Sequence, residues 1–140
     1  MSEKKKGLEL GPAIRKSKGE DVTAVVNLDE GATITLKYTD PTDLRTLRKK
    51  AQSAAWDTDK KCFDAFEEKK QFDLLLADEA VLGFTGMIVD GEEIHYSKEN
   101  TRMLMMHSFI FSEAVHRNVH DVKNFVRERK DAVREKLEKN

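Results

Sequence analysis

The sequence predicts one α+β domain that is predominantly helical and carries small antiparallel β-hairpins. Apolar residues alternate over 22–28 and 34–38, which is typical of strands, and Asp90-Gly91 lies between two short apolar runs. Elsewhere, apolar residues recur at helical intervals. A length of 140 residues suits a single domain. We therefore expect a flexible arm over 1–20 and one domain over 21–140 whose C-terminal end frays.

The N-terminal twenty residues are expected to form a loose arm. They include Lys4-Lys5-Lys6, three glycines and few large apolar groups, so burial could offset little of the entropy lost on ordering. The apolar alternation begins at Val22. It predicts two strands, over 22–28 and 34–38, joined through Asp-Glu-Gly at 29–31.

Helix signals follow the second strand. Asp40 is suited to be an N-cap, and Pro41 fits the first helical position, so a helix is predicted from Pro41 to about residue 55. The next is predicted over 59–82 from apolar positions among many charged residues, with a break near Asp73.

The segment from Gly83 to Asn100 predicts a hairpin and a helix start. Asp-Gly readily takes the positive φ values of a tight turn, and Ser97 can cap the helix that follows. Helical spacing of apolar residues then continues over 103–137. Since Ser108 can cap a new start, two helices with a bend at His107-Ser108 are expected.

Composition argues against several functions. Twenty-five Lys and Arg balance twenty-six Asp and Glu, so no nucleic-acid partner is expected. Cys62 is the only cysteine, which excludes an intrachain disulfide and favours a reducing compartment such as the cytoplasm. No apolar run approaches about 18 residues, so neither a membrane span nor a secretory signal is expected.

Histidines offer the main candidates for chemistry. His116 and His120 are four residues apart, a spacing used in helical zinc sites, but Arg117 stands where a metalloprotease carries its glutamate. We interpret them as ordinary surface or half-buried histidines and predict no metal, no cofactor and no catalytic residue. A small enzyme built around His95, His107 or His116 is a rival hypothesis without any ordering geometry in the sequence.

Methionines gather ahead of three large apolar residues. Met103, Met105 and Met106 precede Phe109, Ile110 and Phe111. Flexible, polarizable methionine side chains suit a surface that adapts to different apolar partners. Core packing would explain any one of these methionines, but together they cover more than one helix face. The candidate client or subunit surface consists of Met103, Met106, Phe109 and Ile110.

The central segment resembles the tail assembly chaperones of long-tailed bacteriophages. That family often shows a glycine-aromatic-glycine turn, an apolar strand, an acidic-glycine turn and a strand ending in a serine that opens a helix. The matching residues are Gly83, Phe84, Gly86, Asp90, Gly91 and Ser97. The resemblance covers about the last 60 residues, through the turns and the cap at fixed separation.

The resemblance implies a non-enzymatic function in the cytoplasm of the bacterial host. Such a chaperone binds the long, helical tape-measure protein, helps recruit tail-tube protein, works as a homo-oligomer and is not expected in the mature virion. A second hypothesis is a bacterial adaptor or regulatory subunit whose apolar helix pairs with one fixed partner.

Overall fold

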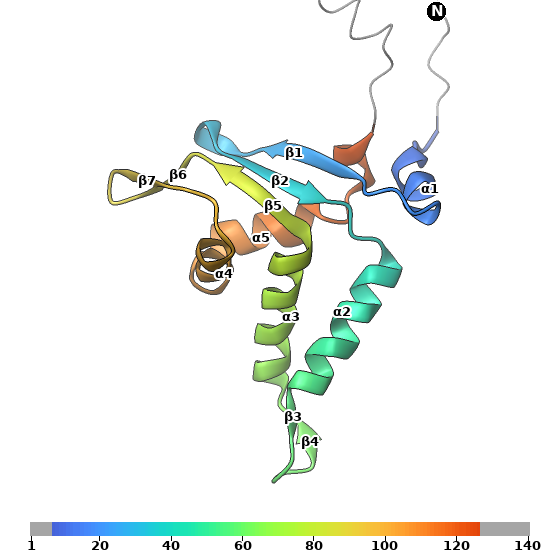
Figure 1. Cartoon of the computed structure of the whole chain (residues 1–140), viewed down its shortest axis with the longest axis vertical. Coiled ribbons are helices and arrows are strands. Elements are labelled where there is room, and N and C mark those ends of the chain that lie inside the picture. The colour runs from blue at the N-terminus through green and yellow to red at the C-terminus, as the bar shows by residue number, and fades with distance from the viewer. Residues whose placement is uncertain (1–6, 127–140) are drawn as a thin grey trace, which may run out of the picture.

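A three-stranded antiparallel sheet lies at one end of the molecule, with helices against one of its faces (Figure 1). The computed structural model describes residues 7–126. The strands follow the order β1 (Thr23–Asn27), β2 (Thr33–Lys37) and β5 (Val81–Thr85). β1 and β2 are joined through the short turn η1 (Asp29–Gly31), and the two predicted strands are therefore confirmed.

The remaining elements complete an α+β domain, which confirms the predicted fold class. α2 and α3 run side by side away from the sheet and end in a small hairpin (Figure 1). These elements are α1 (Gly11–Ser17), α2 (Pro41–Ala54), β3 (Trp56–Asp57), β4 (Cys62–Phe63), α3 (Ala65–Ala80), β6 (Met87–Val89), β7 (Glu92–Ile94), α4 (Lys98–His107), α5 (Phe109–Asn118) and η2 (Val122–Phe125).

The core lies between the sheet and the helices. Strand alternation turns Ile34 and Leu36 inward, where both are almost fully buried. They join Leu76 of α3 and Val115 of α5 in one apolar cluster. Burial of each such side chain contributes about 1.5–3 kcal/mol, so this end of the molecule supplies most of the apolar stabilisation.

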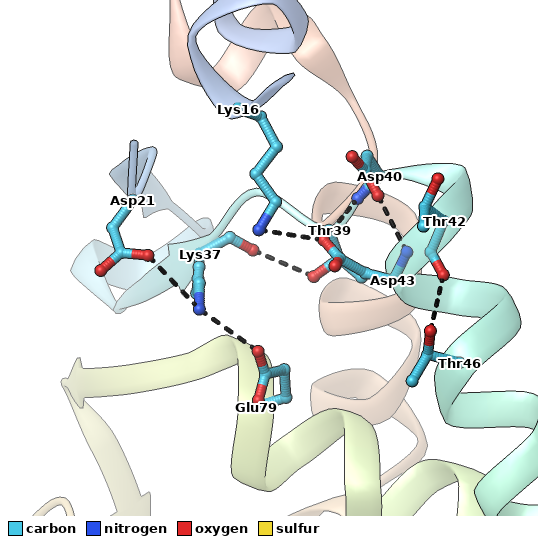
Figure 2. Close-up of polar contacts among 9 residues, drawn as sticks. All are labelled: Lys16, Asp21, Lys37, Thr39, Asp40, Thr42, Asp43, Thr46 and Glu79. Carbon is cyan, nitrogen blue, oxygen red and sulfur yellow. Dashed lines mark hydrogen bonds and ion pairs between the residues drawn. The ribbon is translucent and has the colours of Figure 1, made fainter. Parts of the chain in front are cut away.

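Polar contacts hold the connection from β2 to α2 (Figure 2). Asp40 Oδ1 accepts a hydrogen bond from Asp43 N (2.8 Å), and Asp43 Oδ2 accepts one from Asp40 N (3.2 Å). Each carboxylate thus satisfies a free N–H at the start of α2. Lys16 Nζ lies 3.1 Å from Asp43 Oδ2, which ties α1 to the same cap. The predicted N-cap and the α2 boundaries are confirmed.

Lys37 connects the sheet to α3 in the same region. Its Nζ lies 3.2 Å from Glu79 Oε1 and 3.5 Å from Asp21 Oδ1 (Figure 2). The hydrogen bond to the Glu79 carboxylate raises the pKa of Lys37, and Asp21 raises that pKa further, against the opposing effect of partial burial. The ammonium therefore stays charged where β2 passes α3.

The predicted helix over 59–82 is wrong at both ends. Residues 56–63 form the β3–β4 hairpin, and α3 begins at Ala65 because Asp64 Oδ1 accepts hydrogen bonds from Phe66 N and Glu67 N. α3 also runs through Asp73 without the expected break. Cys62, the only cysteine, consequently lies exposed on β4.

β5 replaces the expected end of that helix. It pairs with β2 from Thr33 opposite Thr85 to Leu36 opposite Val81. Gly83 and Phe84 are consequently strand residues, which corrects the expected glycine-aromatic-glycine turn. A partner about 50 residues away in sequence creates this strand, and such pairing leaves little local signal.

Both chain ends depart from expectation within the described residues. Part of the expected loose arm is the helix α1, where Pro12 is buried. The expected helical continuation beyond α5 is wrong over 119–126, because α5 ends at Asn118 and Val119 O accepts a hydrogen bond from Thr39 N (2.8 Å). Phe125 then packs edge-on against Tyr38. The expected helical positions Val133 and Leu137 lie outside the described residues.

Candidate binding surface

The register of α4 decides which methionine is buried. Thr101 and Met105 are buried and Leu104 is half-buried, which forms one helical face toward the core. Met103 and Met106 lie on the remaining side, 39% and 37% exposed. The core interpretation therefore holds for Met105 and is wrong for Met103 and Met106.

A sharp bend separates α4 from α5. Ser108 leaves helical geometry, with φ −114° and ψ 109°, and its Oγ accepts a hydrogen bond from Phe111 N (3.2 Å). Its own N–H still donates to Leu104 O, which closes α4. Ser108 thus ends one helix and caps the next, which confirms the predicted bend.

The first turn of α5 opens with two exposed apolar side chains. Phe109 and Ile110 are each 80% exposed, whereas Phe111 is buried. Met103 and Met106 lie on α4, just before this bend. They are three residues apart, about one helical turn, so their side chains are neighbours on that helix. We call Met103, Met106, Phe109 and Ile110 the α4–α5 face. Its four members are exposed around one bend, as a binding surface requires.

An ion pair fastens α4 to α3 beside this face. Arg102 Nε donates to Asp78 Oδ1 (2.9 Å), and Arg102 Nη2 donates to Asp78 Oδ2. This two-pronged hydrogen bond lowers the pKa of Asp78, against the opposing effect of partial burial. The carboxylate therefore stays ionised well into acid, and α4 keeps its position on α3.

The hairpin motif joins α4 to the sheet. Phe84 of β5 is buried and packs edge-on against Tyr96, at 5.6 Å between ring centroids, and against Phe111, at 5.9 Å. Tyr96 Oη donates to Val81 O (3.2 Å). Ser97 Oγ then accepts from Asn100 N (2.9 Å), which confirms the predicted cap of α4. The motif residues thus orient the helices and do not form a pocket.

Two turn positions of the motif need their glycines. Gly86 has φ +74°, and a Cβ there would lie 2.8 Å from Ala32 Cα. Asp90 and Gly91 both have positive φ and close the β6–β7 hairpin, which confirms the predicted turn. Gly83 is different, because a Cβ there meets only ordinary contacts with Thr35.

The candidate histidines serve different structural roles. His116 Nε2 lies 2.7 Å from Asp73 Oδ1, and its ring stacks on Phe72. His120 is exposed. Within residues 7–126, the structure places no group of three or more His, Cys, Asp or Glu side chains where they could hold a metal ion. His116 therefore joins α5 to α3 and is not paired with His120.

A second exposed apolar cluster was missed by sequence reasoning. Trp56 and Phe63 pack edge-on at 5.0 Å across the β3–β4 pair, and Phe66 is 89% exposed in the first turn of α3. We call these three residues the hairpin tip. The signal available in the sequence was Asp64 followed by Glu67, the spacing of a helix cap, which separates 56–63 from the helix.

No protein-family model, curated protein or solved structure matches the chain. In the described part of the chain, none of the helices is both long and apolar enough to span a membrane.

Proposed function

We propose that this protein is a non-enzymatic tail assembly chaperone of a long-tailed bacteriophage, which acts in the cytoplasm of the bacterial host. It binds apolar stripes of the tape-measure protein through the α4–α5 face and aids addition of tail-tube protein. The sequence resemblance at 83–100 supports the choice of family, and the exposure of the four apolar residues supports the choice of surface.

One observation carries this proposal. Two of the exposed residues have a buried apolar neighbour in the sequence: Met105 is buried next to exposed Met106, and Phe111 is buried next to exposed Ile110. The helix register therefore separates a core set from an exposed set within a few residues. Exposed large apolar groups around one bend favour a polypeptide partner, and unbranched methionines can repack against successive stripes of a long helix.

Co-expression with the tape-measure protein of the same gene cluster tests the proposal. Replacing Met103 and Met106 together with aspartate places charges on the face, and should reduce the soluble yield of tape-measure protein at least about tenfold. Phe66→Asp is the matched control. It charges a more exposed apolar site, 89% exposed, in the first turn of α3, where a carboxylate is favourable, and should leave the yield unchanged.

Two outcomes would refute the proposal. One is an unchanged yield from a double variant that circular dichroism shows to be folded. The other is a gene cluster without any long helical protein for the chain to solubilise. A single stoichiometric partner that is lost in the same double variant would instead support the adaptor hypothesis.

A further inference from the structure

β1 presents an open edge of the sheet. In the order β1-β2-β5 it has a paired neighbour on one side only, and its other side faces away from the sheet (Figure 1). The ladder to β2 is regular, with Tyr38 N donating to Val22 O (2.7 Å) and Leu28 N donating to Ala32 O (2.8 Å) at its two ends. These bonds fix the direction of every backbone group between them.

Three residues direct their backbone groups outward. Facing pairs alternate along an antiparallel ladder, so the N–H and C=O groups of Thr23, Val25 and Asn27 point away from β2. None of these groups has a hydrogen-bond partner among residues 7–126. The three residues are also the exposed ones of the strand, with Val25 at 60%.

η2 packs beside the start of β1, but the strand itself lacks the sequence features that usually protect an edge. Its five residues, Thr-Ala-Val-Val-Asn, include no charge and no proline, and its pairing has no register shift. The opposite edge strand differs, because the β2–β5 ladder shifts register between Thr35 and Leu36. β1 is therefore the edge prepared for another strand.

We infer that β1 pairs antiparallel with β1 of a second copy, about a two-fold axis at Val25, so that two sheets become one of six strands. In this register Val25 faces Val25 of the second copy, and Thr23 faces its Asn27. Every outward N–H meets an outward C=O, with two hydrogen bonds for each facing pair. If the register shifted by one residue, the outward N–H and C=O groups of one copy would face residues of the other copy whose N–H and C=O groups are already bonded to β2.

A hollow at the Thr23 end accommodates the second copy. It measures about 310 Å³ and is lined by Arg15, Asp21, Thr23 and residues of η2. The turn after β1 of the second copy, which carries Asp29 and Glu30, enters beside this hollow. Asp21 is already paired with Lys37, and Arg15 is paired with Glu20 and donates through Nη2 to Phe125 O. The hollow therefore offers space for the turn, and the attraction between the two copies comes from the outward backbone groups of β1.

Mass measured by light scattering over a range of concentrations tests this pairing. The wild type should approach twice the mass of one chain. Val25→Pro removes the outward N–H at the axis without removing a bond to β2, and should raise the dissociation constant at least about tenfold. Val25→Thr keeps that N–H and should behave as the wild type. A wild type that stays monomeric, or a folded Val25→Pro variant with unchanged mass, would overturn the inference.

Cross-linking decides the register even if Val25→Pro fails to fold. In a Cys62→Ser background, Val25→Cys places one cysteine of each copy at the axis, with the two Cα atoms about 5.5 Å apart. With Thr23→Cys the two Cα atoms are roughly 14 Å apart, since Thr23 faces Asn27 of the second copy and that copy's own position 23 lies four residues further along the strand. A short bis-maleimide should link the first variant and not the second; equal linking of both would refute the register. Aspartate at Met103 and Met106 should leave this dimer intact, which separates the inference from the proposed function.

Discussion

The α4–α5 face and the hairpin tip both expose large apolar side chains, but only the first is built directly on the core. Met105 and Phe111 anchor the face from within, and Arg102 fastens it to α3. The tip lies at the far end of α2 and α3 from the sheet (Figure 1) and is held by paired two-residue strands and one edge-on ring contact.

This difference teaches how each surface meets a partner. Buried neighbours fix the direction of the side chains on the face, so it can bind without first becoming ordered. The tip depends on local contacts and can open without disturbing the core, because few buried side chains lie beneath it. Exposure alone therefore does not distinguish a prepared surface from a loosely held one.

The largest effect on stability is expected at Phe111, the buried neighbour of Ile110 in the α4–α5 face. Phe111→Ala should lower the free energy of unfolding by about 3–5 kcal/mol, because it removes a buried ring that contacts Phe84. Phe109→Ala is the matched control at an exposed site and should change that free energy by less than about 0.5 kcal/mol. Chemical denaturation measures both, and equal losses would contradict the division between core and face.

A middle-sized effect is expected at the bend that shapes the face. Ser108→Ala removes the acceptor for Phe111 N and should cost about 1 kcal/mol of unfolding free energy. Ser53→Ala changes an exposed serine within α2 and should be neutral or slightly stabilising, since alanine favours the helix. If thermal melts show no difference between the two variants, the cap does not stabilise the bend.

A smaller effect is expected at the tip. Phe63→Ala should cost about 0.5–1 kcal/mol and shift the emission of Trp56, the only tryptophan, to longer wavelength, because the edge-on contact is lost. Phe66→Ala should alter emission less, as Phe66 is almost fully exposed. A loss comparable to that of Phe111→Ala would show that the tip is coupled to the core.

The smallest effect is expected from the Arg102–Asp78 ion pair beside the α4–α5 face, which should make the free energy of unfolding depend on pH. Because Arg102 lowers the pKa of folded Asp78, the ionised carboxylate stabilises the fold above its unfolded pKa of about 3.8, and this contribution disappears as pH falls through the lower folded pKa. The difference in unfolding free energy between wild type and Asp78→Asn, below about 1 kcal/mol, should therefore shrink in acid. A constant difference from pH 6 to pH 2 would exclude this linkage.

Short-range signals in the sequence were sufficient for several elements. The cap at Asp40, the Asp90-Gly91 turn and the caps at Ser97 and Ser108 each depend on groups within a few residues, so their positions were predicted correctly. The fold class followed from these elements together. The same reasoning predicted the four residues of the α4–α5 face as a candidate, without indicating which methionine would be buried.

Only the tertiary structure decided features that depend on distant partners. Val81–Thr85 became a strand because β2 was available to pair with it, and α5 ended where the backbone of Val119 met Thr39. Met105 turned inward because α4 packs against α3. A sequence pattern records which residues are apolar, but the neighbour that covers each one is set by contacts between segments far apart in the chain.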